Sequence, residues 1–220
     1  LSIFAWNLGF AALSVVTTFV LGMLLALLLN DPRIKGRAIY RSLLILPYAV
    51  PVFVSALVWA SMFNQDYGLI NNLTGLDIDW FGDPWAARAA ILLTNLWLGF
   101  PYMFVVCTGA LQSIPQDVME AARVDGASEW QLYKSIIFPQ LTPIALSAVI
   151  IIGHMSLKSF DLIMSITDQR TYSTKVPAID MFNFMTDNDY SNAAAVGTIL
   201  LVLVAVAVIP YLIHDAKGRR

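Results

Sequence analysis

The sequence predicts an all-α transmembrane protein with five membrane-spanning helices. Of its 220 residues, 58% are hydrophobic and only 13% are charged, whereas about 25% of the residues of a soluble domain are charged. Five apolar runs each reach the length of about 20 residues that a helix needs to cross a bilayer. The net charge is -2 and no stripe of Lys or Arg is present, so nucleic acid is not expected as a partner.

Polar connections separate the five spans, which we expect to form one transmembrane domain over 1–220. The spans are expected at 3–29, 43–63, 89–111, 144–166 and 193–213. The first connection is short and basic, the second (64–88) and fourth (167–192) are acidic, and the third (112–143) is a polar segment of helical character. This alternation places the first and third connections and the C-terminus on the same side of the membrane.

Lys and Arg are distributed unequally between the two sides. Nine lie in the first and third connections and the C-terminal tail, against three (Arg88, Arg170 and Lys175) in the second and fourth connections. Positively charged connections stay in the cytoplasm, so we expect the C-terminus inside and Leu1 outside. An apolar first residue on the outer side is expected if a further helix precedes it.

Aromatic residues gather in the second connection at Tyr67, Trp80, Phe81 and Trp85. Trp and Tyr are enriched where the membrane meets water, so an interfacial aromatic belt is the simpler interpretation. A docking surface for an external partner is the functional alternative.

Two short helices are predicted in the third connection. Ser113 followed by Gln116, and Ser128 followed by Gln131, both fit the capping box that opens a helix. Gly126 is expected to end the first helix, which runs from about 115 to 124.

The first of these helices suits a protein partner better than the membrane surface. Val118, Ala121 and Ala122 share one face, where small side chains allow another backbone to approach closely. A helix that lies on a leaflet carries mainly Lys and Arg on its polar face, whereas this one carries the acids Asp117 and Glu120 beside a single base, Arg123.

At this point the sequence resembles a known family. Importer permeases of the ATP-binding-cassette class carry a cytoplasmic motif of Glu-Ala-Ala, three residues, Gly, nine residues and Ile-x-Leu-Pro, and only Phe138 departs from it here. The resemblance implies that helix 115–124 is a coupling helix, within a cytoplasmic coupling loop at 112–143 of a six-helix permease core. It implies ATPase-coupling roles for Glu120, Ala121, Ala122, Asp125, Gly126, Ile136 and Pro139.

The sequence has no phosphate-binding loop of the form G-x-x-x-x-G-K-[ST]. We therefore expect no enzyme activity, metal or cofactor on this chain, with ATP and Mg held by a partner ATPase. The resemblance also implies the other partners: a second permease subunit, an ATPase dimer, an extracytoplasmic sugar-binding protein and membrane lipid.

Residues 79–115 resemble the larger permease subunit of maltose importers, above all in Trp-Leu-Gly-x-Pro-Tyr-Met at 97–103. By this resemblance the sugar contacts are Leu98, Gly99, Tyr102, Met155, Ser156, Ser159 and Asp161. These residue types suit the substrate, because an uncharged sugar needs hydrogen-bonding groups and an aromatic face. Tyr102 and Phe100 could supply the aromatic face. Helix packing beside Pro101 is the alternative role of Tyr102.

The later part of the chain departs from the maltose pattern. Maltose permeases carry Thr-x-Gly-Gly-Pro after this span, and residues 166–182 contain no Gly-Gly-Pro. The stretches 156–163 and 176–182 resemble monosaccharide permeases of the same class. Sugar is therefore expected as the substrate class, with a malto-oligosaccharide or a monosaccharide such as glucose as the two possibilities.

His154, Lys158 and Asp161 are spaced as residues on one face of a single helix. A charge at the centre of a membrane helix costs about 2.5–3.5 kcal/mol, so such residues pair with one another or line a cavity. An internal Lys158–Asp161 ion pair is the favoured interpretation, and direct sugar contact and a proton relay are the alternatives.

These observations predict the permease subunit of a sugar importer in a bacterial or archaeal plasma membrane, with several membrane passes and a cytoplasmic C-terminus. An ion- or proton-coupled secondary transporter that uses the face of His154, Lys158 and Asp161 is the first rival. A membrane scaffold that binds an ATPase but transports nothing is the second.

Overall fold

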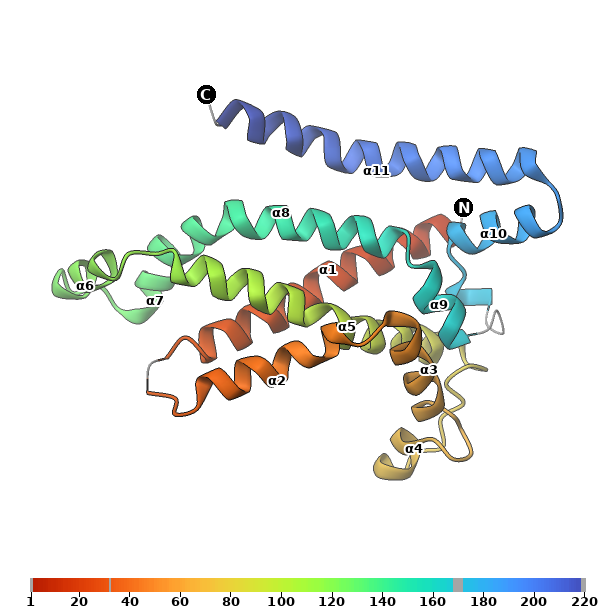
Figure 1. Ribbon diagram of the computed structural model, residues 1–220, viewed down its shortest axis with the longest axis horizontal. Coiled ribbons are helices and arrows are strands. Elements are labelled where there is room, and N and C mark those ends of the chain that lie inside the picture. Colours follow the sequence, from red (N-terminus) through yellow and green to blue (C-terminus); the bar gives the residue numbers. More distant parts are fainter. Residues whose placement is uncertain (1, 32, 168–171, 219–220) are drawn as a thin grey trace. The chain divides into compact units, whose positions relative to one another are not determined.

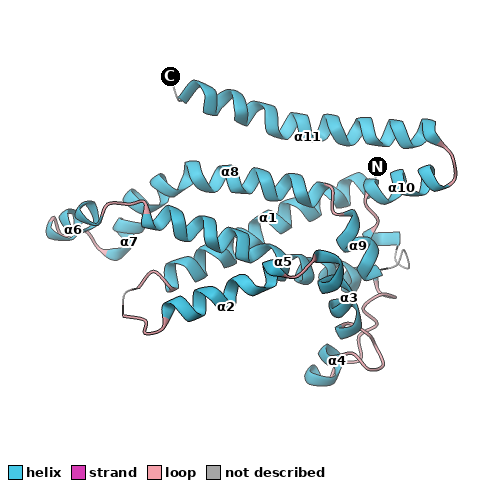
Figure 2. Ribbon diagram, viewed as in Figure 1, coloured by secondary structure: helices cyan, strands magenta, loops and turns pink. Residues whose placement is uncertain are grey.

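The computed structural model describes residues 2–31, 33–167 and 172–218, and all the regular secondary structure within them is helical. No strand occurs within these ranges, which confirms the all-α expectation (Figure 2). The elements, in chain order, are α1 (Ser2–Leu28), α2 (Arg37–Ala49), α3 (Val52–Met62), α4 (Leu69–Thr74), α5 (Pro84–Gln112), α6 (Gln116–Val124), α7 (Glu129–Leu132), the π-helix η1 (Tyr133–Ile137), α8 (Phe138–Leu157), α9 (Phe160–Thr167), the 3₁₀-helix η2 (Tyr172–Thr174), α10 (Pro177–Thr186) and α11 (Tyr190–Gly218) (Figure 1).

Three helices in the described part of the chain are long and apolar enough to cross a membrane: Ser2–Leu28, Pro84–Gln112 and Trp130–Leu157. A fourth span is obtained if α2 and α3 are counted as one. The first covers the run expected at 3–29 except for its last residue, and the second contains the run expected at 89–111. The third begins earlier than expected, because α7, η1 and α8 follow one another without a break.

The span expected at 43–63 is interrupted between α2 and α3. Pro51 is the N-cap residue of α3. It has no N–H to donate to the carbonyl of Pro47, and it favours an extended conformation at Val50. These two effects end one helix at Ala49 and start another at Val52.

The chain forms two compact units, each of which is described by itself. The first unit consists of Leu1–Ser14, Val50–Asn95 and Ile152–Arg220, and the second of Val15–Ala49 and Leu96–Ile151. In the first unit α3 packs against α9, and α10 packs against both α9 and α11. Asn71 holds the second connection together in this unit, since its amide donates to the carbonyls of Gln65 and Ile78 and accepts from the Trp80 indole.

The apolar core of the second unit brings together α1, α5 and the start of α8. Its buried residues are Met23, Ala26, Leu29, Phe104, Cys107, Ala110, Leu111, Ile137 and Leu141. Those on α1 and α5 recur every three or four residues, as expected for helix faces that pack on one another. The π-helix η1 contributes Ile137 to the same core.

Glycine sets the separation of α1 and α5 in the second unit. A Cβ at Gly22 would lie 2.6 Å from Met103 Cβ and 2.8 Å from the Phe104 backbone nitrogen. A Cβ at Gly99 would lie 2.9 Å from Thr18 Cγ2. Backbone rather than a flexible side chain faces Gly22, so no rotamer change could make room there. Gly22 is therefore the tighter of the two contacts.

Replacement of Gly22 by Ala should destabilise the protein, because α1 and α5 would have to separate. Overpacking of this kind costs about 1–3 kcal/mol, which should lower the melting temperature of the purified protein measurably. Gly9→Ala is the matched control, since Gly9 lies on the same helix with nothing within 4 Å of an added Cβ. Equal melting temperatures for the two variants would show that the contact at Gly22 is not limiting.

Candidate functional site

The third connection is built around α6, which ends in a well-defined left-handed cap. The N–H of Ala127 donates to the carbonyl of Ala122, and the N–H of Gly126 donates to that of Arg123. This pair of bonds is the Schellman motif, and it requires a left-handed residue, which is Gly126 at φ +83°. The expectation that Gly126 ends the first helix is thus confirmed.

One of the two predicted capping boxes is present. At the start of α7, the N–H of Ser128 donates to Gln131 Oε1, and the N–H of Gln131 donates to Ser128 Oγ. The prediction for Ser113 was wrong, because its hydroxyl donates back to the carbonyl of Ala110 at the end of α5. The N-cap residue of α6 is Pro115, which makes no side-chain cap bond.

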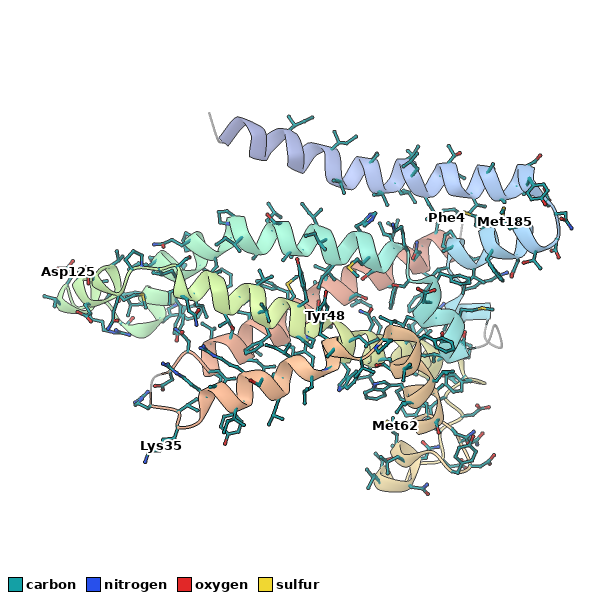
Figure 3. The ribbon with its side chains drawn as sticks, in the orientation of Figure 1. Phe4, Lys35, Tyr48, Met62, Asp125 and Met185 are labelled. Carbon is teal, nitrogen blue, oxygen red and sulfur yellow. The ribbon has the colours of Figure 1, made fainter. Side chains whose placement is uncertain are left out.

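The residues expected to contact an ATPase lie largely at the surface. None of the residues of α6 is buried, and Glu120, Ala121 and Ala122 lie on it. Asp125 follows at the turn after the helix, where its side chain points outward (Figure 3). The apolar side chains of Val124 and Trp130 are also mostly exposed, so this connection presents an apolar as well as a charged surface.

Ile136 and Pro139 lie where the π-helix η1 passes into α8. In a regular α-helix, the ring of Pro139 would clash with the carbonyl of Ser135 four residues earlier. A π-helical turn is wider and places that carbonyl differently, and the N–H of Phe138 donates to Tyr133, five residues back. The helix therefore continues through Pro139.

The first set of predicted sugar contacts lies on α5 in the second unit. Leu98, Gly99 and Tyr102 are all half-buried. The Tyr102 ring stacks on the Tyr48 ring of α2, with centroids 6.4 Å apart and planes at 28°. Phe100 is only 8% exposed, so it does not offer an aromatic face to a sugar in this structure.

The second set lies in the first unit, around the end of α8. Met155 is exposed and Ser156 is buried. The hydroxyl of Ser159 donates to the carbonyl of Met155, so it serves the helix end. Asp161 is exposed in the first turn of α9. The two sets of predicted sugar contacts thus belong to different units.

The expectation that His154, Lys158 and Asp161 share one helical face was wrong. α8 ends at Leu157 and α9 begins at Phe160, and the N–H of Phe160 donates to the carbonyl of Lys158 across a tight turn. Lys158 and Asp161 are both exposed, and no ion pair between them is present. The spacing argument assumed a continuous helix, and the break removes its basis.

Asn7 on α1 is a residue that the sequence analysis missed. It is fully buried in the first unit, and its amide donates to the carbonyl of Leu157, the last residue of α8. A helix that ends among apolar surroundings needs partners for its last carbonyl groups. A lone Asn within an apolar run was the available signal.

Arg88 is a second missed residue, and it connects three segments of the first unit. Its guanidinium lies 4.9 Å from the Trp6 ring centroid and 4.8 Å from that of Trp85. Its Nε donates to the carbonyl of Ser173, and the Trp6 indole donates to that of Thr174. The sequence pattern placed Arg88 among the positive charges of the second connection and gave no sign that it contacts Trp6.

The comparisons with known proteins give a consistent answer. Residues 18–220 match the family described as "Binding-protein-dependent transport system inner membrane component". The chain belongs to this family. This confirms the resemblance to importer permeases.

Several curated relatives of the permease are named "Maltose/maltodextrin transport system permease protein MalF". One from Photorhabdus laumondii is 39% identical over 95% of this chain and 44% of its own length, and one from Yersinia pestis is 38% identical over 95% of this chain and 43% of its own. This chain therefore spans less than half the length of these relatives.

Among solved structures, a bacterial ABC transporter involved in the import of the acidic polysaccharide alginate matches with a TM-score of 0.84 and 25% identity. The match covers 100% of this chain and 78% of that one. The MetNI methionine ABC transporter matches with a TM-score of 0.67 and 19% identity, over 97% of this chain and 92% of that one, and this likeness shows the fold alone.

The permease variant Asp161→Leu should remain abundant and folded. Asp161 is exposed and makes no ion pair with Lys158, so its loss leaves no buried charge. Only its favourable position at a helix N-terminus is lost, which costs about 0.3–1 kcal/mol. Membrane abundance and melting temperature measure the effect, with Lys158→Met as the companion variant. If Asp161→Leu lost its membrane abundance and the added change Lys158→Met recovered it, the interpretation of an internal ion pair would be supported after all.

Proposed function

We propose that this chain is the membrane-spanning translocation subunit of an ATP-binding-cassette sugar importer, and that its substrate is a malto-oligosaccharide. The observation that carries the proposal is the similarity of 95% of the chain to permeases named for maltose and maltodextrin. The motif at 97–103, which the resemblance assigns to sugar contact, lies within the matched residues. ATP hydrolysis and Mg²⁺ binding belong to a partner ATPase in this proposal.

A monosaccharide is the second candidate substrate. The observation in its favour is the sequence after α9, where Gly-Gly-Pro is absent. A secondary transporter driven by protons is less well supported, since His154, Lys158 and Asp161 do not lie on one continuous helix.

The proposed topology has five spans, of which α2 with α3 and α8 with α9 are each interrupted helices. Interrupted helices are common near transporter binding sites, because the backbone groups that they free can face a cavity. The single permease domain over 1–220, the coupling loop at 112–143 and the cytoplasmic C-terminus belong to the same proposal. So do a second permease subunit, an ATPase dimer, an extracytoplasmic binding protein and residence in a prokaryotic plasma membrane.

In the proposed mechanism, α6 transmits motion from the ATPase to the spans. Glu120, Ala121 and Ala122 would sit in a cleft of the ATPase, and Asp125 and Gly126 would form the rigid turn behind them. Ile136 and Pro139 would link this turn to α8. No residue of α6 is fully buried, but Met119 packs against the core of the second unit, so motion of the helix would be passed on to that core.

The proposed sugar contacts are Leu98, Gly99 and Tyr102, followed by Met155, Ser156, Ser159 and Asp161. Tyr102 is the strongest of these, because its ring is half-exposed and already stacks on the Tyr48 ring. Aromatic rings suit the apolar face of a sugar. Gly99 also packs against Thr18, so a Cβ at this position would disturb the helix packing as well as the proposed sugar contact.

The function is tested by sugar uptake into proteoliposomes that contain the complete transporter with its binding protein. We expect ATP-dependent accumulation of labelled maltotriose that is insensitive to a protonophore. Uptake of glucose but not maltotriose would select the second candidate. Uptake that needs a proton gradient and no ATPase would overturn the proposal.

Replacement of Gly126 by Val should weaken the coupling between the permease and its ATPase. An added Cβ would meet nothing within 4 Å, so the effect arises from φ +83°, a conformation that costs a residue with a side chain about 1–2 kcal/mol. Both uptake and binding-protein-stimulated ATP hydrolysis should fall at unchanged membrane abundance. Gly36→Val is the matched control, because Gly36 has φ +73° and equally open surroundings in another connection. Equal losses in the two variants would refute a specific coupling role.

Replacement of Tyr102 by Ala should raise the sugar concentration needed for half-maximal uptake. Loss of one stacking or hydrogen-bonding group weakens binding by about 1 kcal/mol, a factor of about five. Tyr102→Phe separates the two contributions, since it keeps the ring and removes the hydroxyl. The sugar affinity of the binding protein should not change. Unaltered uptake kinetics in Tyr102→Ala would remove Tyr102 from the sugar site.

A further inference from the structure

The bend between α8 and α9 has a defined pattern of hydrogen bonds. α8 ends at Leu157, shortly before α9 begins, and the chain changes direction sharply between the two helices (Figure 1). Within the bend, the N–H of Lys158 donates to the carbonyl of Met155 at 3.1 Å, and the N–H of Ser159 donates to that of Ser156 at 3.3 Å. The carbonyls of Met155 and Ser156 are therefore satisfied by near neighbours in the chain.

The next carbonyl, that of Leu157, is satisfied by a distant part of the chain. Nδ2 of Asn7 on α1 donates to it at 3.3 Å, across 150 residues of sequence. Asn7 is fully buried and Leu157 is only 6% exposed, so water cannot take the place of this donor. The bonding of this carbonyl thus depends on a side chain of another helix.

The Leu157 carbonyl has a second potential donor in the N–H of Asp161. In a regular α-helix each carbonyl accepts from the N–H four residues later, so this bond would continue α8 into α9 without a bend. The stretch 157–163 contains no Pro or Gly that would prevent a continuous helix. Because Asn7 satisfies the carbonyl within the bend, it favours the bent form over the straight one.

The residue before Asn7 fixes the other flank of α9. Nε1 of Trp6 donates to the carbonyl of Thr174 at 3.1 Å, and Thr174 is fully buried. α9 lies between Leu157 and Thr174 in the chain, and it packs against α3. Two successive residues of α1 therefore hold the two flanks of α9.

The amide of Asn7 forms its bond to Leu157 at a cost. Its Oδ1 is buried and has no hydrogen-bond partner in the described part of the chain. A buried polar atom without a partner is unfavourable, and such atoms are rare in native proteins. Asn7 therefore adds less to stability than its burial suggests, and its specific effect is on the position of the Leu157 carbonyl.

We propose that Asn7 is a positioning residue for the sugar site, and that it acts through the bend between α8 and α9. The bend sets how the proposed sugar contacts at the end of α8, Ser156 and Ser159, lie relative to Asp161 in the first turn of α9. A straight helix would change the shape of this site without removing any of its residues. The inference rests on the proposed function, since these residues affect transport only if they contact sugar.

The first test compares two sugars in proteoliposomes that contain the complete transporter with saturating binding protein. The variant is Asn7→Leu, which has nearly the same size and no donor. We expect the ratio of the uptake rates of maltotriose and maltose to change several-fold. The ratio is the decisive measurement, because a loss of folded transporter lowers both rates equally. The melting temperature should change little, because the Leu157 carbonyl can accept from Asp161 and the unpartnered Oδ1 is removed.

Thr94→Val is the matched control. Thr94 is a fully buried polar residue of the same unit, and its hydroxyl donates at 2.9 Å to the carbonyl of Ala90 on its own helix. The replacement removes a buried hydrogen bond that does not involve the bend. The ratio of the two uptake rates should therefore equal that of the wild type.

The second test follows the bend itself, by hydrogen–deuterium exchange in the complete transporter. The first N–H groups of a helix have no partner within it, so those at the start of α9 should exchange faster in the bent form than in a straight helix. We expect exchange over 157–163 to slow in Asn7→Leu and to stay unchanged in Thr94→Val.

Each test can overturn the proposal. Unchanged or faster exchange over 157–163 in Asn7→Leu would show that Asn7 does not maintain the bend. Slower exchange with an unaltered ratio of uptake rates, or an equal shift of that ratio in Thr94→Val, would show that the bend does not set sugar selectivity. Failure of the proposed function gives a different result, since the wild type would then accumulate neither sugar.

Discussion

α1 meets α5 at Gly22 with no space for a single additional carbon atom, and the second unit is arranged around this contact. Met103 and Phe104, which face Gly22, are themselves buried, and Phe104 belongs to the same core as Met23 and Ala26. Helix association in a membrane gains little from apolar burial alone, because lipid chains are as apolar as the side chains. Close packing through small residues supplies much of the remaining attraction. The start of α8 then joins this α1–α5 pair through Ile137 and Leu141.

Backbone hydrogen bonding imposes the second constraint, since every break in a membrane helix frees polar groups. The break before α3 is produced by Pro51, which has no N–H to leave unpaired. The break after α8 exposes the carbonyl of Leu157, and the buried side chain of Asn7 donates to it. At Pro139 the helix avoids a break altogether by adopting a π-helical turn. These three solutions differ because proline removes a donor, whereas the end of α8 leaves an acceptor.

Local signals in the sequence predicted the third connection well, and tertiary contacts limited the rest. Gly126 and the Ser128–Gln131 box act over a few residues, so their roles could be recognised from the pattern alone. Ser113 shows the limit of that approach, because a Ser near a helix junction can bond forward or backward, and here it closes α5. The Lys158–Asp161 pair failed for a different reason, since it assumed one continuous helix. The remaining features depend on residues that are far apart in the chain, which one sequence does not reveal. Gly22 meets Met103 of α5, Asn7 bonds to Leu157, and Arg88 bonds to Ser173.

The exposure of α6 relates the fold to the proposed coupling role. A helix of nine residues is marginal in water without packing, and within this chain α6 has no fully buried residue, although Met119 packs against the core of the second unit. Its ends are instead fixed locally, by Pro115 at the start and by the bonds of Gly126 and Ala127 at the end. Bonds at its own ends therefore keep α6 helical, and they do not depend on where the helix lies relative to a partner. A partner that covers Val118, Val124 and Trp130 would then gain burial that the isolated chain cannot supply, and the free energy of that contact would set the position of the helix.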